Sequence, residues 1–215
     1  MNRRHLTRQL LALALAAPAL ALHPLLATAA APEAADTFIQ RVTTAAMDAV
    51  RADPAIQAGD AQKVSALVDG LIMPNVNFSR MTSSAVGRYW RQATPQQQQL
   101  LQDEFKTLLV RTYSGALAQV KDQTLTFRPL RAAPDATDVV VRSDLRGRGE
   151  PIQLDYRVEK TAAGWKIYDL NVMGIWLVET YRTQFAQEIS ARGIDGLISA
   201  LVRRNQNNAT AQRAG

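Results

Sequence analysis

The chain has no cysteine, and its only two histidines, His5 and His23, stand near the amino terminus. Without cysteine the protein forms no disulfide, so a packed core has to supply its stability. Serine–histidine and cysteine–histidine nucleophile systems need these residue types, and so do the usual zinc sites. The composition therefore argues against most hydrolytic and zinc-dependent chemistry.

Long apolar runs are absent except for residues 10–22, which follow a basic segment with three arginines. This run has the length of a secretory signal and falls short of the roughly 20 residues that span a bilayer. Small residues at Ala27 and Ala29 suit a signal peptidase. We expect segment 1–29 to be removed with both histidines, and the sequence leaves open whether the Sec or the twin-arginine route exports the chain.

The charge of the chain is mildly positive. The formal charge is +6, and removal of three arginines and no acid with the signal lowers it to +3. So small an excess is a weak argument for nucleic-acid binding, and it equally suits a protein that works near anionic membrane surfaces.

Helical patterns fill the first half of the mature chain. Apolar residues recur at helical spacing after Asp36, Asp60 and Asn77, each of which can cap a helix. Thr94-Pro95-Gln96-Gln97 combines a capping box with a proline at the first helical position. The sequence predicts helices over 36–53, 60–73, 77–90 and 94–120.

The period changes to that of strands in the middle of the chain. Four segments, 125–127, 139–141, 152–158 and 165–172, alternate or are rich in apolar β-formers, with turn residues between them. Short connections predict antiparallel neighbours in a curled meander with one wet face, to which Asp155 and Arg157 belong.

Helical spacing returns after Gly174 and is broken at Gly193, and Asp195 can cap a last helix. The polar residues 206–215 are expected to be a disordered tail. The sequence thus predicts one α+β domain over 30–205, in which about six helices cover a curled four-stranded antiparallel sheet. Helices gathered on one face of such a sheet make a half-cone whose mouth can stay open.

Two segments carry a distinctive pattern. Residues 85–95 read AVGRYWRQATP and continue through Phe105 and Tyr113, and residues 164–178 contain GWKIYDL and GIWLV and continue to GIDGL at 193–197. Together they resemble the signatures of the MlaC, or toluene-tolerance (Ttg2-type), family of periplasmic phospholipid-binding proteins. The likeness covers nearly all of the mature chain.

The resemblance implies an NTF2-like or cystatin-like cone with an apolar pocket. It also implies a soluble, monomeric phospholipid carrier of the periplasm, which belongs to the Mla pathway that maintains outer-membrane lipid asymmetry. Its expected partners are an outer-membrane lipoprotein bound to a porin and an inner-membrane ABC transporter with an MCE-domain ring. Phospholipid would be the cargo, and no cofactor, metal, nucleic acid or catalytic residue is expected.

The candidate lipid-binding residues come from the sheet, the helices and the glycine hinge at Gly174. Leu154, Tyr156 and Val158 alternate on one face of a strand, and Tyr113 matches a family tyrosine whose hydroxyl would lie at the wet end of the pocket. Ordinary core packing explains each of these residues equally well. The full set is Phe78, Met81, Tyr113, Leu117, Val139, Val141, Leu154, Tyr156, Val158, Val172, Ile175 and Trp176.

Two other classes of function remain open at this point. A periplasmic chaperone or peptide binder would also need an apolar groove. Enzymes with the ketosteroid-isomerase-like cone use an acid and a tyrosine in the pocket, but Asp155 and Tyr156 are strand neighbours and face opposite sides.

The basic turn 146–149 would contact a phosphate headgroup or a partner, or would simply be solvated.

Overall fold

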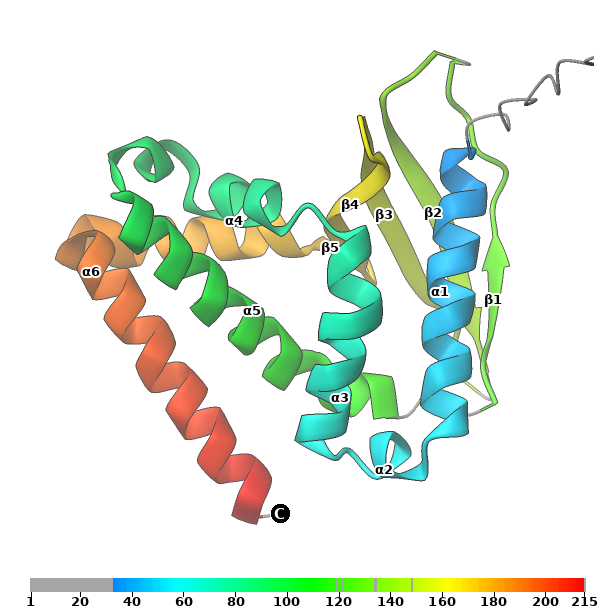
Figure 1. The fold of residues 1–215 in the computed structure, drawn as a ribbon, viewed down its shortest axis with the longest axis horizontal. Coiled ribbons are helices and arrows are strands. Elements are labelled where there is room, and N and C mark those ends of the chain that lie inside the picture. The colour runs from blue at the N-terminus through cyan, green and yellow to red at the C-terminus, as the bar shows by residue number, and fades with distance from the viewer. Residues whose placement is uncertain (1–32, 119, 121, 134, 148, 215) are drawn as a thin grey trace, which may run out of the picture. The chain divides into compact units, whose positions relative to one another are not determined.

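A computed structural model describes residues 33–118, 120, 122–133, 135–147 and 149–214 of the chain. The predicted signal, 1–29, lies outside these residues. The structure combines helices with one antiparallel sheet, as predicted (Figure 1). The strands are β1 (Thr124–Phe127), β2 (Asp138–Arg146), β3 (Ile152–Thr161), β4 (Gly164–Val172) and β5 (Ile175–Trp176).

The sheet has five strands in the order β1-β2-β3-β4-β5, so the prediction of four strands is wrong. The additional strand, β5, pairs Ile175 with Val172 and Trp176 with Asn171. Met173 (φ 53°) and Gly174 (φ 86°) form the reversal before β5 in the left-handed region. Two residues are too few to show a strand period, so the sequence assigned them to the following helix.

Each pair of neighbouring strands is antiparallel, as the short connections predicted. Val139 lies opposite Val158, and Val141 lies opposite Tyr156, which places these apolar side chains on one face. The register shifts by one residue after Arg157 in the β3–β4 pair. The shift keeps Ile167 on the apolar face with Val158.

Side-chain caps begin several helices. Thr94 and Gln97 exchange reciprocal hydrogen bonds, so the predicted capping box is confirmed, and Asn77 accepts from the Arg80 amide. Asp36 does not cap, because the helix already begins at Ala35. The helical segments are α1 (Ala35–Ala52), α2 (Pro54–Gln57), α3 (Ala61–Leu67), η1 (Val68–Ile72), η2 (Met73–Asn75), α4 (Phe78–Val86), η3 (Gly87–Gln92), α5 (Pro95–Ala118) and α6 (Leu177–Ala214).

The last helix, α6, contains the predicted break. Gly193 has φ 72° and ψ −177°, which is not helical, and helical residues lie on both sides of it. Asp195 accepts a hydrogen bond from Gln97 Nε2 at 2.6 Å, which ties α6 to the start of α5. Helix α6 continues to Ala214 and so includes most of the segment 206–215 that was expected to be disordered.

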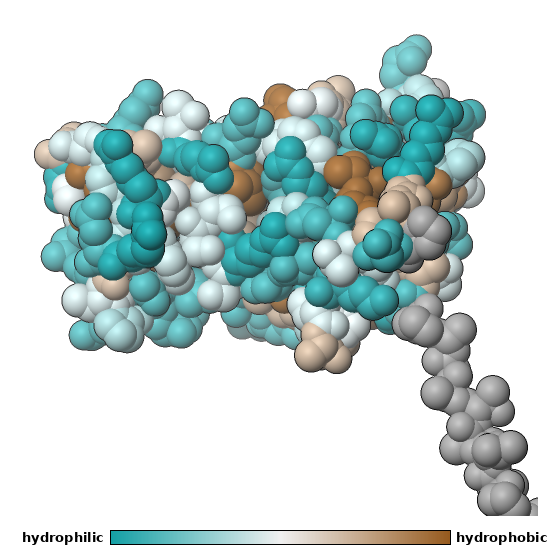
Figure 2. Space-filling view, turned by 90° about the horizontal axis from the view of Figure 1, so that it is seen from above, coloured by the Kyte–Doolittle hydropathy of each residue, from teal (hydrophilic) through white to brown (hydrophobic). Residues whose placement is uncertain are grey.

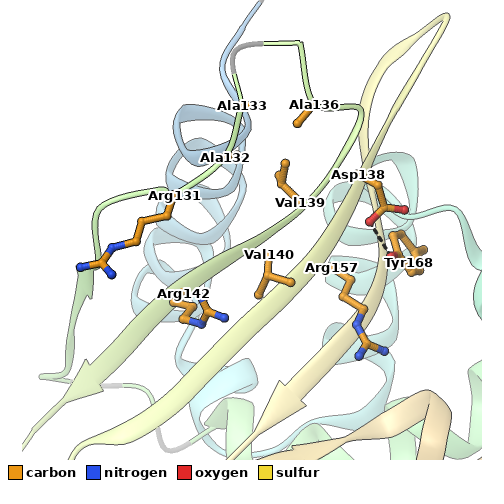
Figure 3. Close-up of a pocket in the computed structure, with 10 residues that line it drawn as sticks. All are labelled: Arg131, Ala132, Ala133, Ala136, Asp138, Val139, Val140, Arg142, Arg157 and Tyr168. Atoms are coloured by element: carbon orange, nitrogen blue, oxygen red, sulfur yellow. Dashed lines mark hydrogen bonds between the residues drawn. The ribbon is translucent and has the colours of Figure 1, made fainter.

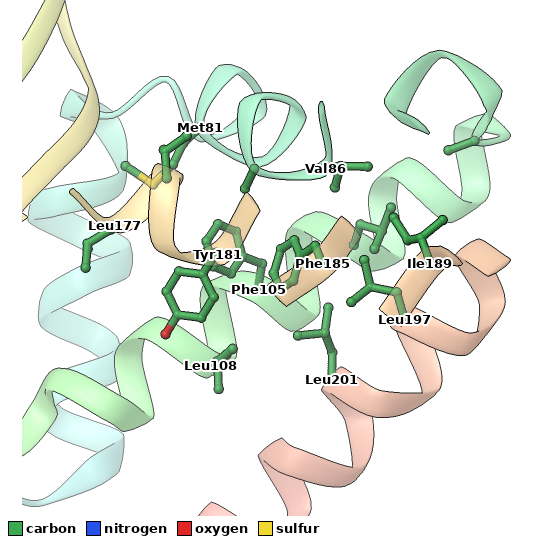
Figure 4. Close-up of a cluster of buried hydrophobic side chains, with 14 residues drawn as sticks. Met81, Val86, Phe105, Leu108, Leu177, Tyr181, Phe185, Ile189, Leu197 and Leu201 are labelled. Carbon is green, nitrogen blue, oxygen red and sulfur yellow. The ribbon is translucent and has the colours of Figure 1, made fainter. Parts of the chain in front are cut away.

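Buried apolar residues form three clusters rather than one core. The helix cluster joins α4, α5 and α6 around Phe105, whose ring centroid lies 4.9 Å from that of Tyr181 and 5.2 Å from that of Phe185 (Figure 4). The sheet cluster joins α1 to the apolar face of the sheet. A smaller cluster of Val50, Ile56, Val64 and Val68 joins α1, α2, α3 and η1.

The helices are attached to the sheet chiefly through β4. The Asn77 amide, before α4, donates to the Ile167 carbonyl at 2.8 Å, and the Val178 amide, in the first turn of α6, donates to Asp169 at 3.0 Å. The segment from α3 to η2 contacts α5, α1 and β4 in turn. It therefore lies between the helix cluster and the sheet cluster.

Candidate functional site

The apolar face of the sheet brings together the predicted wall residues. Val139, Val141, Tyr156 and Val158 are buried, and Leu154 packs against them half-buried. Helix α1 covers this face with Phe38, Ile39 and Val42, which belong to the same cluster. Burial raises the pKa of Tyr156 to about 12, against the opposing effect of a hydrogen bond with Ser143. Its hydroxyl is therefore a neutral group at neutral pH.

One edge of the apolar face is open. Leu154 pairs with Val172 and Val172 pairs with Ile175, so the three side chains form a row across β3, β4 and β5. Leu154 and Val172 are half-buried, and Ile175 is 58% exposed. The row thus leads from the interior to the surface beside the glycine hinge at Gly174. In Figure 2, apolar residues show in brown between the polar residues of the surface.

The helical members of the predicted set lie in the other large cluster. Met81 is buried among α4, α5 and α6, and Phe78 and Tyr113 pack against this cluster half-buried. Burial raises the pKa of Tyr113, and the nearby charge of Arg204 opposes this effect, so Tyr113 faces α6. The side chain of Leu117 lies outside the described part of α5. The predicted set is therefore divided between the sheet cluster and the helix cluster.

Apolar side chains outside the predicted set join the clusters to one another. Val76 and Leu170 pack against both the helix cluster and the sheet cluster. Leu109 of α5 packs half-buried against the helix cluster, and the half-buried Leu67, Ile72, Met73 and Val110 pack against the smaller cluster around Val64. The apolar spacing of these residues is visible in the sequence, but which cluster each one joins depends on how distant elements pack.

Residues 68–72 form a π-helix with Gly70 at its centre. A π-helical turn inside a helix is frequent at functional sites and interrupts the regular spacing of side chains. Asp69 of this turn accepts a hydrogen bond from Lys106 of α5 at 3.1 Å. The turn therefore interrupts the helical spacing of the apolar residues in this segment.

Trp176 lies apart from the other predicted residues. Its ring stacks on the Arg157 guanidinium at 4.0 Å, on the polar face of the sheet. Arg157 also donates to Asp169 at 3.0 Å. Burial raises the pKa of Asp169, while the Val178 and Leu170 amides and Arg157 act in the opposite direction. Asp169 thus joins the sheet to the first turn of α6.

The polar face of the sheet is drier than predicted. Asp155, Asp169 and Asn171 are buried, so the expectation of a wet face is wrong for these residues. Asn171 accepts from the Gly174 amide at 2.8 Å, and Gln153 donates to Asp155 at 2.7 Å. The turn before β5 and the first turn of α6 fold back over this part of the sheet, which a strand pattern alone does not show.

The surface of the described structure is hollowed on the sheet and beside the helices. A recess of about 400 Å³ lies on the polar face of the sheet, and Figure 3 shows Arg142 and Arg157 projecting into it from β2 and β3. A groove of about 630 Å³ lies between η3 and α6, beside Tyr89 and Arg182. The recess includes only Val139 of the predicted lipid-binding residues, and the groove includes none of them.

The described residues contain no cluster of acids or histidines arranged to hold a metal ion. Within the same part of the chain, no helix has a stretch long and apolar enough to cross a bilayer. The described sheet has one apolar face, which belongs to the sheet cluster, and charged groups on the opposite face.

Comparison with known proteins identifies the family. Residues 40–203 match the family described as MlaC protein. The chain belongs to the MlaC family. Its similarity to toluene tolerance protein Ttg2D of Pseudomonas putida is 27% identity over 177 residues, which cover 82% of this chain and 81% of that protein.

Two further relatives are similar to this MlaC-family chain. The intermembrane phospholipid transport system binding protein MlaC of Haemophilus influenzae is 23% identical over 146 residues, which cover 66% of this chain and 68% of that protein. A phospholipid-binding protein from Ralstonia solanacearum, solved in complex with a phospholipid, is 50% identical with a TM-score of 0.81. The match covers 82% of this chain and 99% of that one.

Proposed function

We propose that this protein is a periplasmic phospholipid carrier. The observation that carries the proposal is the 50% identity and TM-score of 0.81 to a protein solved with a bound phospholipid. The acyl chains would lie between the sheet cluster and the helix cluster, and the headgroup would lie near Ile175. The carrier would exchange lipid between an outer-membrane lipoprotein–porin complex and an inner-membrane ABC transporter with an MCE-domain ring.

Energetics supports a buried site over a surface groove. Two acyl chains hold on the order of 30 methylenes, and at about 0.8 kcal/mol each their exposure to water costs roughly 24 kcal/mol. Ion pairs between a headgroup and an exposed rim contribute only about 0 to 1 kcal/mol. A carrier therefore has to enclose the tails and can leave the headgroup in water, as the row from Leu154 to Ile175 allows.

The described residues support binding rather than catalysis. The sheet face that carries Tyr156 is apolar, and the nearest acid in sequence, Asp155, points to the opposite face, where Gln153 donates to it. We therefore propose that the site contains no acid–base pair. A phospholipid without a cofactor is the expected occupant.

Native mass spectrometry of gently purified mature protein tests the carrier proposal. We expect a mass excess equal to one or more phospholipids, and organic extraction of the same sample should yield phospholipid. A chaperone or peptide binder would instead release peptide under the same treatment. The proposal would be contradicted if protein purified without detergent carries no lipid and takes none from phospholipid vesicles.

Amino-terminal sequencing of exported protein tests the proposed location. We expect a mature chain that begins near Ala30 in the periplasmic fraction, because residues 10–22 have the length of a secretory signal. Recovery of uncleaved chain from a membrane fraction would contradict this part of the proposal.

A further inference from the structure

The polar face of the sheet directs positive charge outward. In the pair of Arg80 and Asp138 the acid is the more exposed partner, with side-chain fractions of 34% and 50%. In three further ion pairs on this face the arginine is more exposed than its acid. The exposed side-chain fractions are 49% for Arg128 and 14% for Asp144, 50% for Arg142 and 5% for Asp155, and 36% for Arg157 and 1% for Asp169. The face is therefore close to neutral in formal charge but presents guanidinium groups to the surroundings.

The recess of about 400 Å³ concentrates this charge. Arg142 and Arg157 line it from β2 and β3, and Arg131 lines it from the segment before β2 (Figure 3). The one acid in its lining, Asp138, accepts from Arg80 at 2.9 Å and from the Tyr168 hydroxyl at 2.7 Å. Three arginines and one acid line the recess, so its lining carries a positive formal charge.

The arginines of the recess are only partly committed to their acids. Arg142 lies 4.0 Å from Asp155, beyond hydrogen-bond distance, and Asp155 takes its hydrogen bond from Gln153. Arg131 is exposed, and the described residues include no acid paired with it. Guanidinium groups with unused donors bind carboxylates in paired, bidentate hydrogen bonds.

We propose that this recess is a docking site for an acidic segment of a partner protein. Carboxylate side chains of a loop or a chain end fit a concave, arginine-lined recess. A bilayer surface is flat on this scale, and its peripheral ligands insert apolar side chains beside basic ones. The exposed large apolar residues of the described structure are Leu100, Met173 and Ile175, and none of them lines the recess.

The inference rests on the proposed function only in that a carrier has to dock on the proteins that supply and receive its lipid. The apolar face of the sheet would hold the lipid, and the opposite face would hold the partner. Loading of lipid and docking should therefore be separable by mutation, because Arg142 lies on the face of β2 opposite to Val139 and Val141, and Arg131 lies before this strand.

Binding of a hexaglutamate peptide to the mature protein tests the proposal. The test variant combines Arg131→Gln with Arg142→Gln, and the control combines Arg91→Gln with Arg203→Gln, which removes the same charge from exposed positions elsewhere. We expect the test variant to bind the peptide about tenfold more weakly at low salt and the control to change little. Amide NMR shifts should locate the peptide on β2 and β3.

Two results would overturn the proposal. The first is that the parent protein does not bind the peptide, or that both variants bind it equally weakly. The other is stronger binding to vesicles containing phosphatidylglycerol than to the peptide, with the same dependence on Arg131 and Arg142, which would make the partner a membrane. Should the double variant fail to fold, Arg131→Gln alone gives the same comparison, because this side chain is exposed.

Lipid content separates this inference from the proposed function. The test variant should retain as much extractable phospholipid as the parent. A protein that carries lipid but does not bind the peptide would remain a carrier without this docking site. Peptide binding by a protein that carries no lipid would support the docking site alone.

Discussion

Leu154 is the residue that tests the sheet wall with least harm to the fold, because it is half-buried at the open edge of the apolar face. We expect Leu154→Glu to reduce bound phospholipid sharply, since an unpaired carboxylate in an apolar site costs several kcal/mol unless it is protonated. The free energy of unfolding should fall by only about 1–3 kcal/mol, because water can reach the edge. Lipid extraction and thermal unfolding measure the two effects.

Leu100→Glu is the matched control. Leu100 is exposed on α5, so the same substitution there should alter neither lipid content nor unfolding. Loss of stability without loss of lipid in Leu154→Glu would show that Leu154 belongs to a solid core, which is the alternative that the sequence left open.

Tyr156 links stability to alkaline pH. The pKa of Tyr156 is about 12 in the folded protein and 10.0 without the effects of the fold. The unfolded chain therefore loses its phenol proton first as pH rises. The free energy of unfolding is unaffected by this group below pH 10. It falls by roughly 2–3 kcal/mol as pH rises from 10 to 12. Urea unfolding over this range should show less alkaline loss in Tyr156→Phe.

The Tyr156→Phe variant should still lose some stability at alkaline pH because of Tyr168. Burial and a hydrogen bond to Asp138 also raise the pKa of Tyr168 to about 12. Tyr89→Phe serves as the control, since its exposed hydroxyl bonds Ser190 and Arg88, which lower its pKa. An unchanged alkaline slope in Tyr156→Phe would mean that water reaches the Tyr156 hydroxyl.

At the scale of the elements, the break in α6 depends on one glycine. Gly193 has φ 72° and ψ −177°, a conformation essentially confined to glycine. We expect Gly193→Ala to lower the free energy of unfolding by about 1–3 kcal/mol through backbone strain. Urea unfolding at neutral pH measures the change.

Gly115 provides the opposite case in α5. It is helical and exposed, and a methyl group added there would meet nothing within 4 Å. Gly115→Ala should therefore raise the free energy of unfolding by about 0.5–1 kcal/mol. A loss of similar size at both glycines would contradict backbone strain as the cause at Gly193, because an added methyl group meets nothing within 4 Å at either position.

At the scale of the whole molecule, the two faces of the sheet should respond differently to salt. About 1 M NaCl reduces the screening length to ~3 Å, which weakens contacts between exposed charges and leaves apolar burial intact. We expect bound phospholipid to stay with the protein at this salt concentration. Extraction after gel filtration in high salt measures the lipid that remains, and a stripped protein would show that binding is chiefly electrostatic.

Local patterns predicted much of the element order. Thr94 and Gln97 form the capping box that their spacing predicted, and Gly193 breaks the last helical segment where the period ended. Strand alternation correctly placed Val141 and Tyr156 on one face and Asp155 on the other. These features depend on neighbours in sequence, and the chain therefore displays them directly.

Features that depend on distant contacts were missed. The strand β5 exists because Ile175 and Trp176 pair with β4, and Asp169 is buried where the Val178 amide of α6 donates to it. The division of the predicted lipid-binding residues between two clusters likewise depends on where α1 and α5 pack. Period and propensity contain no information on such packing.

The sequence by itself determined the family, the α+β order, the glycine breaks and the lack of cysteine, because each is written in residue types and short spacings. Only the tertiary structure decided which apolar residues face one another and which charges point outward. An arginine and an acid on one strand face look equivalent in sequence, but folding buries Asp155 and Asp169 and leaves Arg142 and Arg157 more exposed. A carboxylate can be satisfied by short bonds within the fold, whereas the longer arginine side chain reaches the surface.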